Sequence, residues 1–520
     1  MVIRKISYYR VIVSLCLFMF LLSPVFGDEI SAVSFDKELP ENNIVTIQPD
    51  SLRILHNPLT GWVLYASMGV DAADFWAQYD HMYIPELGHN VSVTDYAHTL
   101  YIRASWTDFN PQEDVYGWKI DSNLRAYIEG AYQRNMRLAF RVVVDSRDKR
   151  TEFTPQFVKD AGAKGFMNKG KWSPYSDDPV FQKYYTKFVK ALAKDFNDPS
   201  KVEFIDGFGL GKWGEYHTMI YSTGDDTPKK AVFDWVTDIY SQAFDKVPVV
   251  INYHRWIGAG KDWVDDEHFA ADSEEMLEEA IKKGYSLRHD AFGMTTYYGS
   301  WERRFAKKYR NICPIIMEGG WIVKSHSYWQ DPRGYRKDSH EDVRRGEFDD
   351  SKEAHVNMMD FRFGDTESWF KDAFDLVRRF LREGGYRLYP SEISLPLEVS
   401  KKTTPTIKHC WNNMGWGYCP TNIPQWNQKY KVAFALLDSE TNEVRYTFVD
   451  TNTDLSKWIK GSPAEYVFEP DMSKVETGTY VWAVGLVDRS NKDLVGLDIA
   501  AKGDILDSGW LKLSKVSIKK

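Results

Sequence analysis

The sequence lacks a metal-binding motif and an excess of positive charge, and both absences narrow the possible functions. Its histidines and acidic residues do not take the spacing of a zinc motif, so we predict no metal and disfavour a metal-dependent hydrolase. Lys and Arg number 66 against 74 Asp and Glu, which gives a formal net charge of −8. A chain of this charge is not expected to bind nucleic acid or an anionic membrane surface.

Long apolar runs are also missing, except at the N-terminus. There Arg4, Lys5 and Arg10 precede an apolar stretch over 11–22, and residue 27 is the small residue that a signal peptidase requires. The stretch is too short to cross a bilayer comfortably. We therefore interpret 1–27 as a signal peptide and expect an exported chain, secreted or periplasmic, with no membrane segment after cleavage. Cleavage would move the formal net charge from −8 to −11. The oligomeric state stays open.

Cysteine is scarce, with 4 in 520 residues, and Cys16 lies in the signal segment. Cys313 lies in an apolar strand pattern, where a buried, unreactive thiol is the better interpretation. Cys410 and Cys419 are nine positions apart, and export permits a disulfide between them. A disulfide and two free thiols both stay open, because sequence does not give their geometry.

What the sequence does contain is a distinctive stretch at Val202–His217, which reads VEFIDGFGLGKWGEYH. Apolar residues typical of a buried parallel strand run into several glycines and then into Glu215. Glycines permit positive φ and close backbone approach, so they can direct Glu215 to a site at the end of the strand. The glycines also match G-x-G-x-x-G, but no helical pattern opens before about residue 228. This argues against nicotinamide binding, and we predict no cofactor.

A second stretch, Asn311–Trp321, repeats this design with an apolar strand, Glu318, two glycines and a tryptophan. Glu318 follows Glu215 by 103 positions. A strand–helix repeat takes roughly 30 residues or more, so about three repeats separate the two glutamates. Glutamates at the carboxyl ends of parallel strands face the same mouth of a barrel. This pairing is the strongest functional signal in the sequence.

Between residues 57 and 384, strand-like runs alternate with helical patterns, which predicts an α/β fold, a (β/α)8 TIM barrel. The predicted strands are 59–66, 100–105, 138–144, 202–208, 249–253, 292–298, 312–317 and 356–363. The predicted helices include 122–134, 180–196, 229–244, 273–283 and 367–383.

Beyond residue 389 the helical periodicity stops, and short alternating runs predict an all-β sandwich. Strands are expected at 429–436, 443–449, 480–487 and 509–516. The predicted organisation is a signal peptide at 1–27, a catalytic (β/α)8 barrel at 28–388 and a β-sandwich accessory domain at 389–520. We favour a buttressing role for the sandwich over carbohydrate binding.

Two facing carboxyl groups are what glycoside hydrolysis requires, one protonated and the other ionised. Trp213 and Tyr216 flank Glu215, and desolvation by such neighbours raises a carboxyl pKa, so we assign Glu215 as the acid/base. Glu318 is then the nucleophile and is expected to stay ionised. Aromatic residues make up 15% of the chain, which also suits stacking on sugar rings.

Polar and aromatic residues near the predicted strand ends are the candidates for contacting a substrate or holding the nucleophile. Arg103, Arg141 and either Tyr297 or Tyr298 would hold Glu318, although each arginine can equally belong to a structural ion pair. The full set of substrate-binding candidates is Arg103, Trp106, Arg141, Trp213, His217, Asn252, His254, Tyr297, Tyr298 and Trp321.

These motifs resemble the retaining glycoside hydrolases of clan A. The segments Tyr101–Asp121 and Leu138–Val144 are similar to the second and third strands of its β-galactosidase-like members. The resemblance covers about 60–389 and implies an acid/base after strand 4 and a nucleophile after strand 7, which match Glu215 and Glu318. It also implies an arginine on strand 2, a tyrosine after strand 6 and a carbohydrate substrate, with a lean towards a β-linked hexoside such as a β-galactoside.

The chain departs from the clan pattern at two places. The asparagine that usually precedes the acid/base is Gly214 here, so Asn252 or His254 would have to contact the sugar instead. The tryptophan that many members carry on strand 8 is also missing, and Phe361, Phe363 or Trp369 would replace it. The sugar, the linkage and exo or endo action therefore stay open. The alternative function is a non-catalytic carbohydrate-binding protein on a hydrolase-like barrel, although binding alone would need neither glutamate.

Overall fold

The computed structural model describes residues 42–520 apart from 147–150, 261–266, 294–296 and 321–339. The predicted signal peptide and the candidate Trp321 lie outside this part of the chain. Within it, no helix combines the length and the apolar character needed to span a membrane.

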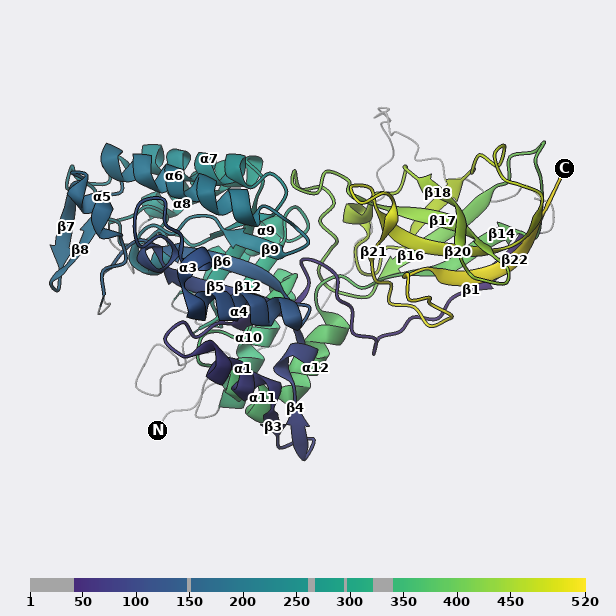
Figure 1. Ribbon diagram of the computed structural model, residues 1–520, viewed down its shortest axis with the longest axis horizontal. Coiled ribbons are helices and arrows are strands. Elements are labelled where there is room, and N and C mark those ends of the chain that lie inside the picture. Colours follow the sequence, from purple (N-terminus) through teal and green to yellow (C-terminus); the bar gives the residue numbers. More distant parts are fainter. Residues whose placement is uncertain (1–41, 147–150, 261–266, 294–296, 321–339) are drawn as a thin grey trace, which may run out of the picture. The chain divides into compact units, whose positions relative to one another are not determined.

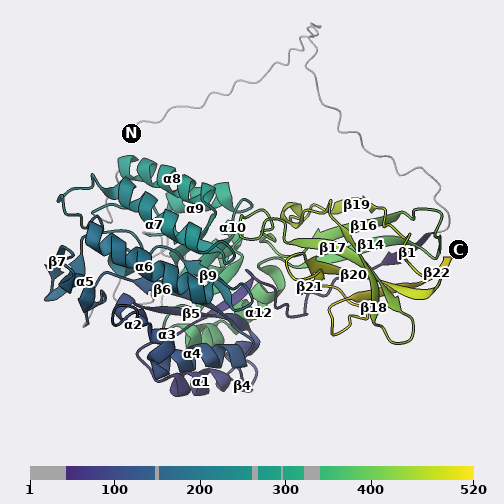
Figure 2. The same cartoon turned by 45° about the horizontal axis from the view of Figure 1, so that its top comes forward.

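Eight parallel strands close into a barrel, which confirms the predicted (β/α)8 architecture. Their order around the barrel follows the chain, and the last strand pairs with the first. Helices lie outside the ring, and Figure 2 shows α4, α6 and α7 next to the strands that they follow or precede. The barrel strands are β2 (Gly61–Tyr65), β5 (Ala97–Ser105), β6 (Arg137–Val143), β9 (Val202–Asp206), β10 (Val249–Asn252), β11 (Tyr285–Phe292), β12 (Ile315–Gly319) and β13 (Met358–Asp360).

The helices and two small hairpins complete this part of the chain. The helices are α1 (Ala72–Asp80), α2 (Trp106–Phe109), α3 (Gly117–Ile120), α4 (Ser122–Gln133), α5 (Gln156–Asp160), α6 (Pro179–Phe196), α7 (Lys229–Ala243), α8 (Glu267–Lys282), α9 (Ser300–Tyr309), α10 (His340–Ala354), α11 (Thr366–Asp372) and α12 (Phe374–Glu383). The hairpins pair β3 (Met82–Ile84) with β4 (His89–Val91) and β7 (Gly165–Asn168) with β8 (Lys171–Pro174).

Helix α6 illustrates why these segments become helical. The Asp178 side chain caps it by accepting a hydrogen bond from the Phe181 N–H at 2.9 Å, and Pro179 occupies the first turn, where a missing N–H costs nothing. Its buried residues recur at helical spacing, so one apolar face packs against the barrel. They are Phe181, Tyr185, Phe188, Val189, Leu192, Ala193 and Phe196.

The sixth strand differs from the sequence-based prediction. We predicted it at 292–298, whereas β11 spans Tyr285–Phe292. The sequence YSLRHDAF carries three charged or titratable residues in its centre, which is unusual for a buried strand. Arg288 and Asp290 are buried inside the barrel with ionic partners, so the polar pattern indicates function and not exposure.

Inside the barrel the side chains change character from one end to the other. Strand alternation directs every second residue inward. Towards the amino ends these residues form an apolar layer of Val63, Tyr101, Ala139, Phe204, Val250, Ile316 and Met358. One step closer to the carboxyl ends, the inward positions become polar or charged, with Arg103, Arg141, Asp206, Asn252, Arg288, Asp290, Glu318 and Asp360.

The C-terminal part forms two antiparallel-rich sheets, which confirms the predicted sandwich. One sheet has the order β1-β14-β16-β19, and the other has the order β15-β22-β20-β17-β18 with β21 paired to β20. Residues of both sheets share one apolar core, including Trp411 and Trp482. The strands are β1 (Asn42–Thr46), β14 (Leu388–Pro396), β15 (Glu398–Ser400), β16 (Ile407–Asn413), β17 (Tyr430–Asp438), β18 (Val444–Asp450), β19 (Ala464–Phe468), β20 (Gly478–Asp488), β21 (Leu494–Leu497) and β22 (Leu511–Lys519).

Strand β1 precedes the barrel in sequence but belongs to a C-terminal sheet. It pairs antiparallel with β14, from Asn42 opposite Pro396 to Thr46 opposite Glu392. Figure 1 shows this purple strand next to the green and yellow strands. Residues 41–520 form a single compact unit, and the division at residues 388 and 389 stays a prediction. Cys313, Cys410 and Cys419 are free thiols in this structure.

Candidate active site at the carboxyl end of the barrel

The loop after β9 is shaped by glycines that direct Glu215 into the barrel mouth. Gly209 has φ of 77°, and a Cβ added there would lie 2.2 Å from the carbonyl oxygen of Val142. Gly211 has φ of 74°, and its Cβ would lie 2.8 Å from the carbonyl oxygen of His217. Only glycine fits such positions. A short 3-10 turn at Lys212–Gly214 is followed by no α-helix until α7 at Lys229, so the G-x-G-x-x-G match does not open an α-helix.

The same loop carries three non-glycine residues in the left-handed region. They are Trp213, Tyr216 and Thr218, with φ of 60°, 58° and 52°. Each such conformation costs free energy and persists only where the surroundings enforce it. Here the Arg103 guanidinium donates a hydrogen bond to the Trp213 carbonyl at 2.7 Å, which helps to hold the loop. Strain concentrated around Glu215 is typical of a functional site.

Glu215 is buried, with 5% of its surface exposed, and has both charged and neutral partners. Its Oε1 lies 3.5 Å from Arg141 Nη1 and 3.9 Å from Arg103 Nη2. Its Oε2 lies 3.4 Å from His217 Nε2 and accepts a 3.5 Å hydrogen bond from the Tyr297 hydroxyl. Several residues from different strands therefore converge on this carboxyl group.

His254 holds the backbone of the acid/base residue. Its Nε2 donates to the Glu215 carbonyl at 2.7 Å, and its Nδ1 accepts from the Trp256 N–H at 3.1 Å. This pairing selects the neutral tautomer with the proton on Nε2. Burial first, and the neighbouring His217 second, hold the pKa of His254 well below its usual range, in agreement with a neutral ring. Both ring nitrogens of His254 have protein partners, and through them it holds the Glu215 backbone in place.

Glu318 lies at the end of β12, 3% exposed, and its ionic partner is an arginine that the sequence did not indicate. Arg288 Nη2 donates to Glu318 Oε2 at 2.5 Å and lies 3.4 Å from Asp360 Oδ2. Asp360 is the residue directly opposite Glu318 in the β12–β13 pairing. Arg288 therefore serves two carboxyl groups on adjacent strands.

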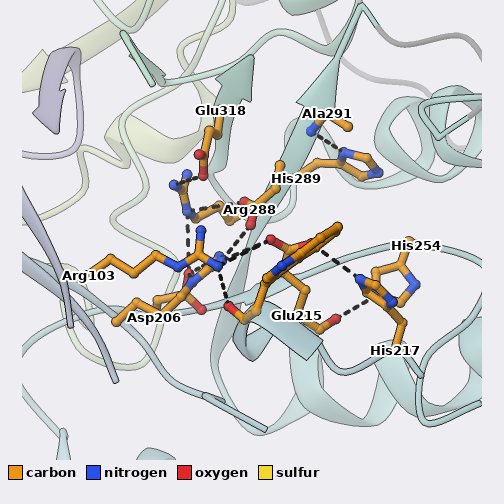
Figure 3. A network of polar contacts seen from close by, with 12 residues as sticks. Arg103, Asp206, Glu215, His217, His254, Arg288, His289, Ala291 and Glu318 are labelled. Carbon is orange, nitrogen blue, oxygen red and sulfur yellow. Dashed lines mark hydrogen bonds and ion pairs between the residues drawn. The ribbon is translucent and has the colours of Figure 1, made fainter. Parts of the chain in front are cut away.

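The glutamates belong to one cluster of buried charges (Figure 3). Arg141 donates to Asp206 Oδ2 through Nε at 2.6 Å and to Asp290 Oδ2 through Nη1 at 2.5 Å. Arg288 Nε lies 3.4 Å from Asp206 Oδ2 and 3.6 Å from Asp290 Oδ1. The cluster thus combines three guanidinium groups with five carboxyl groups, so ionising every acid would leave a net negative charge in a dry interior. The members are Arg103, Arg141, Arg288, Asp206, Glu215, Asp290, Glu318 and Asp360.

The surroundings within this cluster shift the pKa values of the acids in opposite directions. Burial first, and the Asp290 charge second, raise the pKa of both Glu215 and Glu318. Burial raises the pKa of Asp360 to about 7, against the influence of Arg288. Asp290 behaves in the opposite way: burial would raise its pKa, but Arg141 and Arg288 hold it well below the usual range. Asp290 is therefore the acid of the cluster whose ionised form its surroundings favour most.

The raised pKa of Glu215 agrees with its predicted role as a protonated acid. The raised pKa of Glu318 differs from the ionised state that we predicted. The physical reason is that its ionic partner, Arg288, is shared with Asp360 and lies close to Asp206 and Asp290. One guanidinium cannot compensate several buried anions fully.

Most of the predicted site residues meet at this mouth. Arg103 and Arg141 both approach Glu215, and His217 and Tyr297 lie on its other side. Trp213 is half-buried in the loop, with Lys212 Nζ 4.3 Å from its ring centroid. Asn252 ends β10 with 2% exposure, and among the described residues neither polar atom of its amide has a hydrogen-bond partner. A buried amide without partners is costly unless a ligand or water satisfies it.

Two predicted residues lie away from the mouth. Trp106 is fully buried and packs against Phe181, Tyr185 and Phe188, so it belongs to the core between barrel and helices. Tyr298 stacks on Phe292 at 4.3 Å and lies behind the site. Its neighbour Tyr297 faces the mouth and donates a hydrogen bond to Glu215. Trp321 lies outside the described residues.

The three residues proposed to replace the strand-8 tryptophan differ in their exposure. Phe361 and Trp369 are fully buried and pack on Trp62, with ring centroids 4.3 and 4.9 Å away. Phe363 is 53% exposed and contacts Tyr65 with centroids 5.8 Å apart. Phe363 is therefore the one of the three that can contact a substrate.

Sequence reasoning missed four members of the charge cluster: Asp206, Arg288, Asp290 and Asp360. A usable signal existed for two of them, because each lies two positions beyond an apolar residue that points into the barrel. Asp206 follows Phe204, and Asp360 follows Met358. A charge at the carboxyl end of an otherwise apolar barrel strand is typical of a functional residue.

This chain is therefore a closed parallel β/α barrel whose acidic side chains gather at the carboxyl ends of the strands. Neither a protein-family model nor a curated protein sequence matches the chain. Comparison with solved structures gives weak similarities to glycoside hydrolases, the group that the two glutamate segments resemble.

Three of these structures cover most of the chain. An endo-beta-1,4-mannanase from Thermotoga petrophila shares 13% identity, with 89% of this chain and 98% of the other covered and a TM-score of 0.38. A GH30 endoxylanase from Clostridium papyrosolvens C71 shares 10% identity, with 81% and 96% covered and a TM-score of 0.38. Endo-glycoceramidase II from Rhodococcus sp. shares 12% identity, with 82% and 99% covered and a TM-score of 0.37. At such values the similarity carries no information about the substrate of this chain.

Proposed function

We propose that this chain is an exported glycosidase that cleaves a poly- or oligosaccharide by a retaining double displacement. The observation that carries the proposal is the pair of buried glutamates at the barrel mouth, Glu215 and Glu318, each paired with an arginine of one charge cluster. Arg141 influences the pKa of both carboxyl groups, so they belong to one electrostatic unit. Glycoside hydrolysis needs two carboxyl groups of this kind.

In the first step Glu318 attacks the anomeric carbon while Glu215 gives its proton to the glycosidic oxygen. The C–O bond to the leaving group breaks, its electron pair stays on the leaving oxygen, and a glycosyl ester forms on Glu318. In the second step the Glu215 carboxylate takes a proton from water, the water oxygen attacks the anomeric carbon, and Glu318 leaves as a carboxylate. The raised pKa of Glu215 supports its part as the acid.

Glu318 must lose its proton before it attacks. Arg288 favours the ionised form through a charge-assisted hydrogen bond at 2.5 Å, whereas burial, Asp290 and Asp360 oppose it. We therefore expect the acid limb of the pH–rate profile to lie at higher pH than an ordinary glutamate would give, because burial and the neighbouring acids oppose ionisation of Glu318.

In this proposal the sugar binds to a buried amide that has no hydrogen-bond partner among the described residues and to aromatic rings that are partly exposed. The Asn252 amide would exchange hydrogen bonds with a sugar hydroxyl, which compensates for Gly214 in the usual asparagine position. The rings of Trp213 and Phe363 would stack on sugar faces. We propose a β-linked hexoside such as a β-galactoside as the substrate, with the chain acting outside the cytoplasm and the sandwich buttressing the barrel.

A panel of nitrophenyl glycosides, assayed with and without a chelator, tests the proposal. We expect turnover of at least one β-glycoside that the chelator leaves unchanged and that Glu318→Ala abolishes. Turnover that survives in Glu318→Ala would remove the nucleophile assignment. Glycan binding by the native chain without any turnover across the panel would favour the alternative, a non-catalytic carbohydrate-binding protein.

A further inference from the structure

Asp290 lies on β11 between the arginines that serve the two glutamates. Its Oδ2 accepts a hydrogen bond from Arg141 Nη1 at 2.5 Å, and its Oδ1 lies 3.6 Å from Arg288 Nε. The side chain is 3% exposed, so water gives it little support. Nothing in the assignment of Glu215 as acid and Glu318 as nucleophile explains why a third acid is buried at this point.

The two oxygens of Asp290 are not equally satisfied. Oδ2 has the arginine, but among the described residues no N–H and no hydroxyl donates a hydrogen bond to Oδ1. The carboxyl group of Glu215 lies beside Asp290, because Arg141 Nη1 is 2.5 Å from Asp290 Oδ2 and 3.5 Å from Glu215 Oε1. A side-chain hydrogen bond with Glu215 also contributes to the lowered pKa of Asp290. Two carboxylates would repel each other, whereas a carboxylic acid donates a strong hydrogen bond to a carboxylate.

The arginines decide which of the two acids carries the proton. Asp290 is in direct contact with a guanidinium at 2.5 Å, while Glu215 lies 3.5 and 3.9 Å from its nearest guanidinium nitrogens. The anion is therefore better stabilised on Asp290, and the proton is better placed on Glu215. The raised pKa of Glu215 and the lowered pKa of Asp290 agree with this distribution.

We propose that Asp290 is a positioning residue that keeps Glu215 protonated through a carboxyl–carboxylate hydrogen bond, with Arg141 bridging the pair. The hydrogen bond itself does not depend on the activity of the protein, but its meaning for catalysis rests on the proposed function. It fixes the direction of the Glu215 proton before a substrate arrives. After Glu215 has given that proton to the leaving group, the nearby Asp290 charge strengthens the resulting carboxylate as a base towards water.

The groups that face this pair come from several elements around the barrel. On the side of Glu215 they are Arg103 from β5, Arg141 from β6, His217 from its own loop, His254 after β10 and Tyr297 after β11. On the side of Asp290 they are Arg141, Arg288, Asp206 on β9, and the more distant Glu318 and Asp360.

Infrared spectroscopy tests the protonation of Glu215 and its dependence on Asp290 without any assay of activity. At pH 7 we expect the native chain to show carbonyl absorption from protonated carboxyl groups, and we expect Glu215→Gln to lose one component of it. An unchanged protonated-carboxyl absorption in Glu215→Gln would overturn the proposal. Because burial alone would also favour a protonated Glu215, the same component should in addition weaken or shift in Asp290→Asn, or in Asp290→Leu where Asp290→Asn fails to fold. A component that the Asp290 variant leaves unchanged would overturn the role of Asp290.

The pH–rate profile on a nitrophenyl glycoside tests the consequence for catalysis. The alkaline limb reports loss of the Glu215 proton, so Asp290→Asn should move it to lower pH by on the order of one unit. The matched control is Asp360→Asn, which removes a buried acid next to Arg288 and Glu318 but not next to Glu215. It should move the acid limb only.

An alkaline limb that stays in place in Asp290→Asn would overturn the positioning role, and a merely structural role would lower activity without moving it. If no glycoside is turned over at all, the proposed function fails, while the infrared result still decides whether the carboxyl pair exists.

Discussion

The two ends of the barrel both bury acidic residues, but they compensate them differently. At the amino end, Glu203 is 2% exposed and accepts hydrogen bonds from Arg137 Nε at 2.5 Å, the Thr99 hydroxyl at 3.4 Å and the Leu59 backbone N–H. One acid there meets one guanidinium and two neutral donors. At the carboxyl end, five acids share three guanidinium groups, and the Asn252 amide has no hydrogen-bond partner among the described residues.

This difference separates a structural ion pair from a reactive site. An acid with a full set of partners is stable in only one protonation state, so its role is to stabilise the fold. An under-compensated set must keep some members protonated, and small changes in its surroundings move protons among them. A buried charged residue is therefore weak evidence of a functional site. A buried cluster in which acids outnumber basic residues is stronger evidence.

The largest expected effect is on activity, in Glu318→Gln. We expect kcat to fall by on the order of 10⁴-fold or more, because the covalent step loses its nucleophile. The melting temperature should stay level or rise, since an amide replaces a buried acid whose ionisation its surroundings oppose. Comparing kcat with the thermal unfolding of the same preparation checks both. A clear loss of stability would mean that Glu318 is a structural partner of Arg288.

The amino end should respond in the opposite way to Glu203→Gln. We expect a loss of about 3 kcal/mol in the free energy of unfolding, at the low end for a buried pair because Arg137 is 21% exposed. Both limbs of the pH–rate profile should keep their positions. Denaturant unfolding measures the first quantity, and a moved limb would contradict the separation of the two ends.

Asp360→Asn tests how one buried acid at the carboxyl end affects the pH dependence of stability. The pKa of Asp360 in the folded chain is about 7, raised from its ordinary 3.8 mainly by burial. A raised carboxyl pKa gives stability that is present at low pH and is lost as pH rises through the folded value. The native chain should therefore lose stability between about pH 4 and pH 7 relative to Asp360→Asn. Melting temperatures of both chains across that range provide the check, and parallel curves would contradict it.

The smallest effect concerns the strained loop. Trp213 has φ of 60°, which glycine adopts freely and alanine does not. Trp213→Gly and Trp213→Ala remove the same ring, so both should raise KM by a similar factor. The glycine variant should be more stable by about 1 kcal/mol. Equal stability of the two variants would show that the loop relaxes once the indole is removed.

The sequence predicted the barrel because apolar strands and amphipathic helices alternate with a regular period. It also predicted Glu215 and Glu318, because a carboxylate between an apolar run and glycines is conspicuous. It failed at β11, where Arg288 and Asp290 interrupt the apolar pattern that identifies a buried strand. Their meaning depends on partners contributed by β6, β9 and β12, and pairings across a barrel are not visible along the chain.

The roles of individual aromatic residues were equally hidden. Trp106 and Trp213 look alike in sequence, each near the end of a predicted strand. The first packs beneath helices and the second remains half-buried in the loop. Which face of a segment meets a helix depends on tertiary packing, so local patterns could not separate the two.

Strand β1 is synthesised long before the strand with which it pairs. The ribosome makes Asn42–Thr46 early, yet the neighbour with which it pairs, β14, emerges only about 340 residues later. At roughly 5–20 residues per second this is a delay of tens of seconds. During that time the barrel strands can assemble with one another, while an unpaired β edge waits at the start of the chain. A barrel expressed without its C-terminal sheets would leave that edge permanently uncovered.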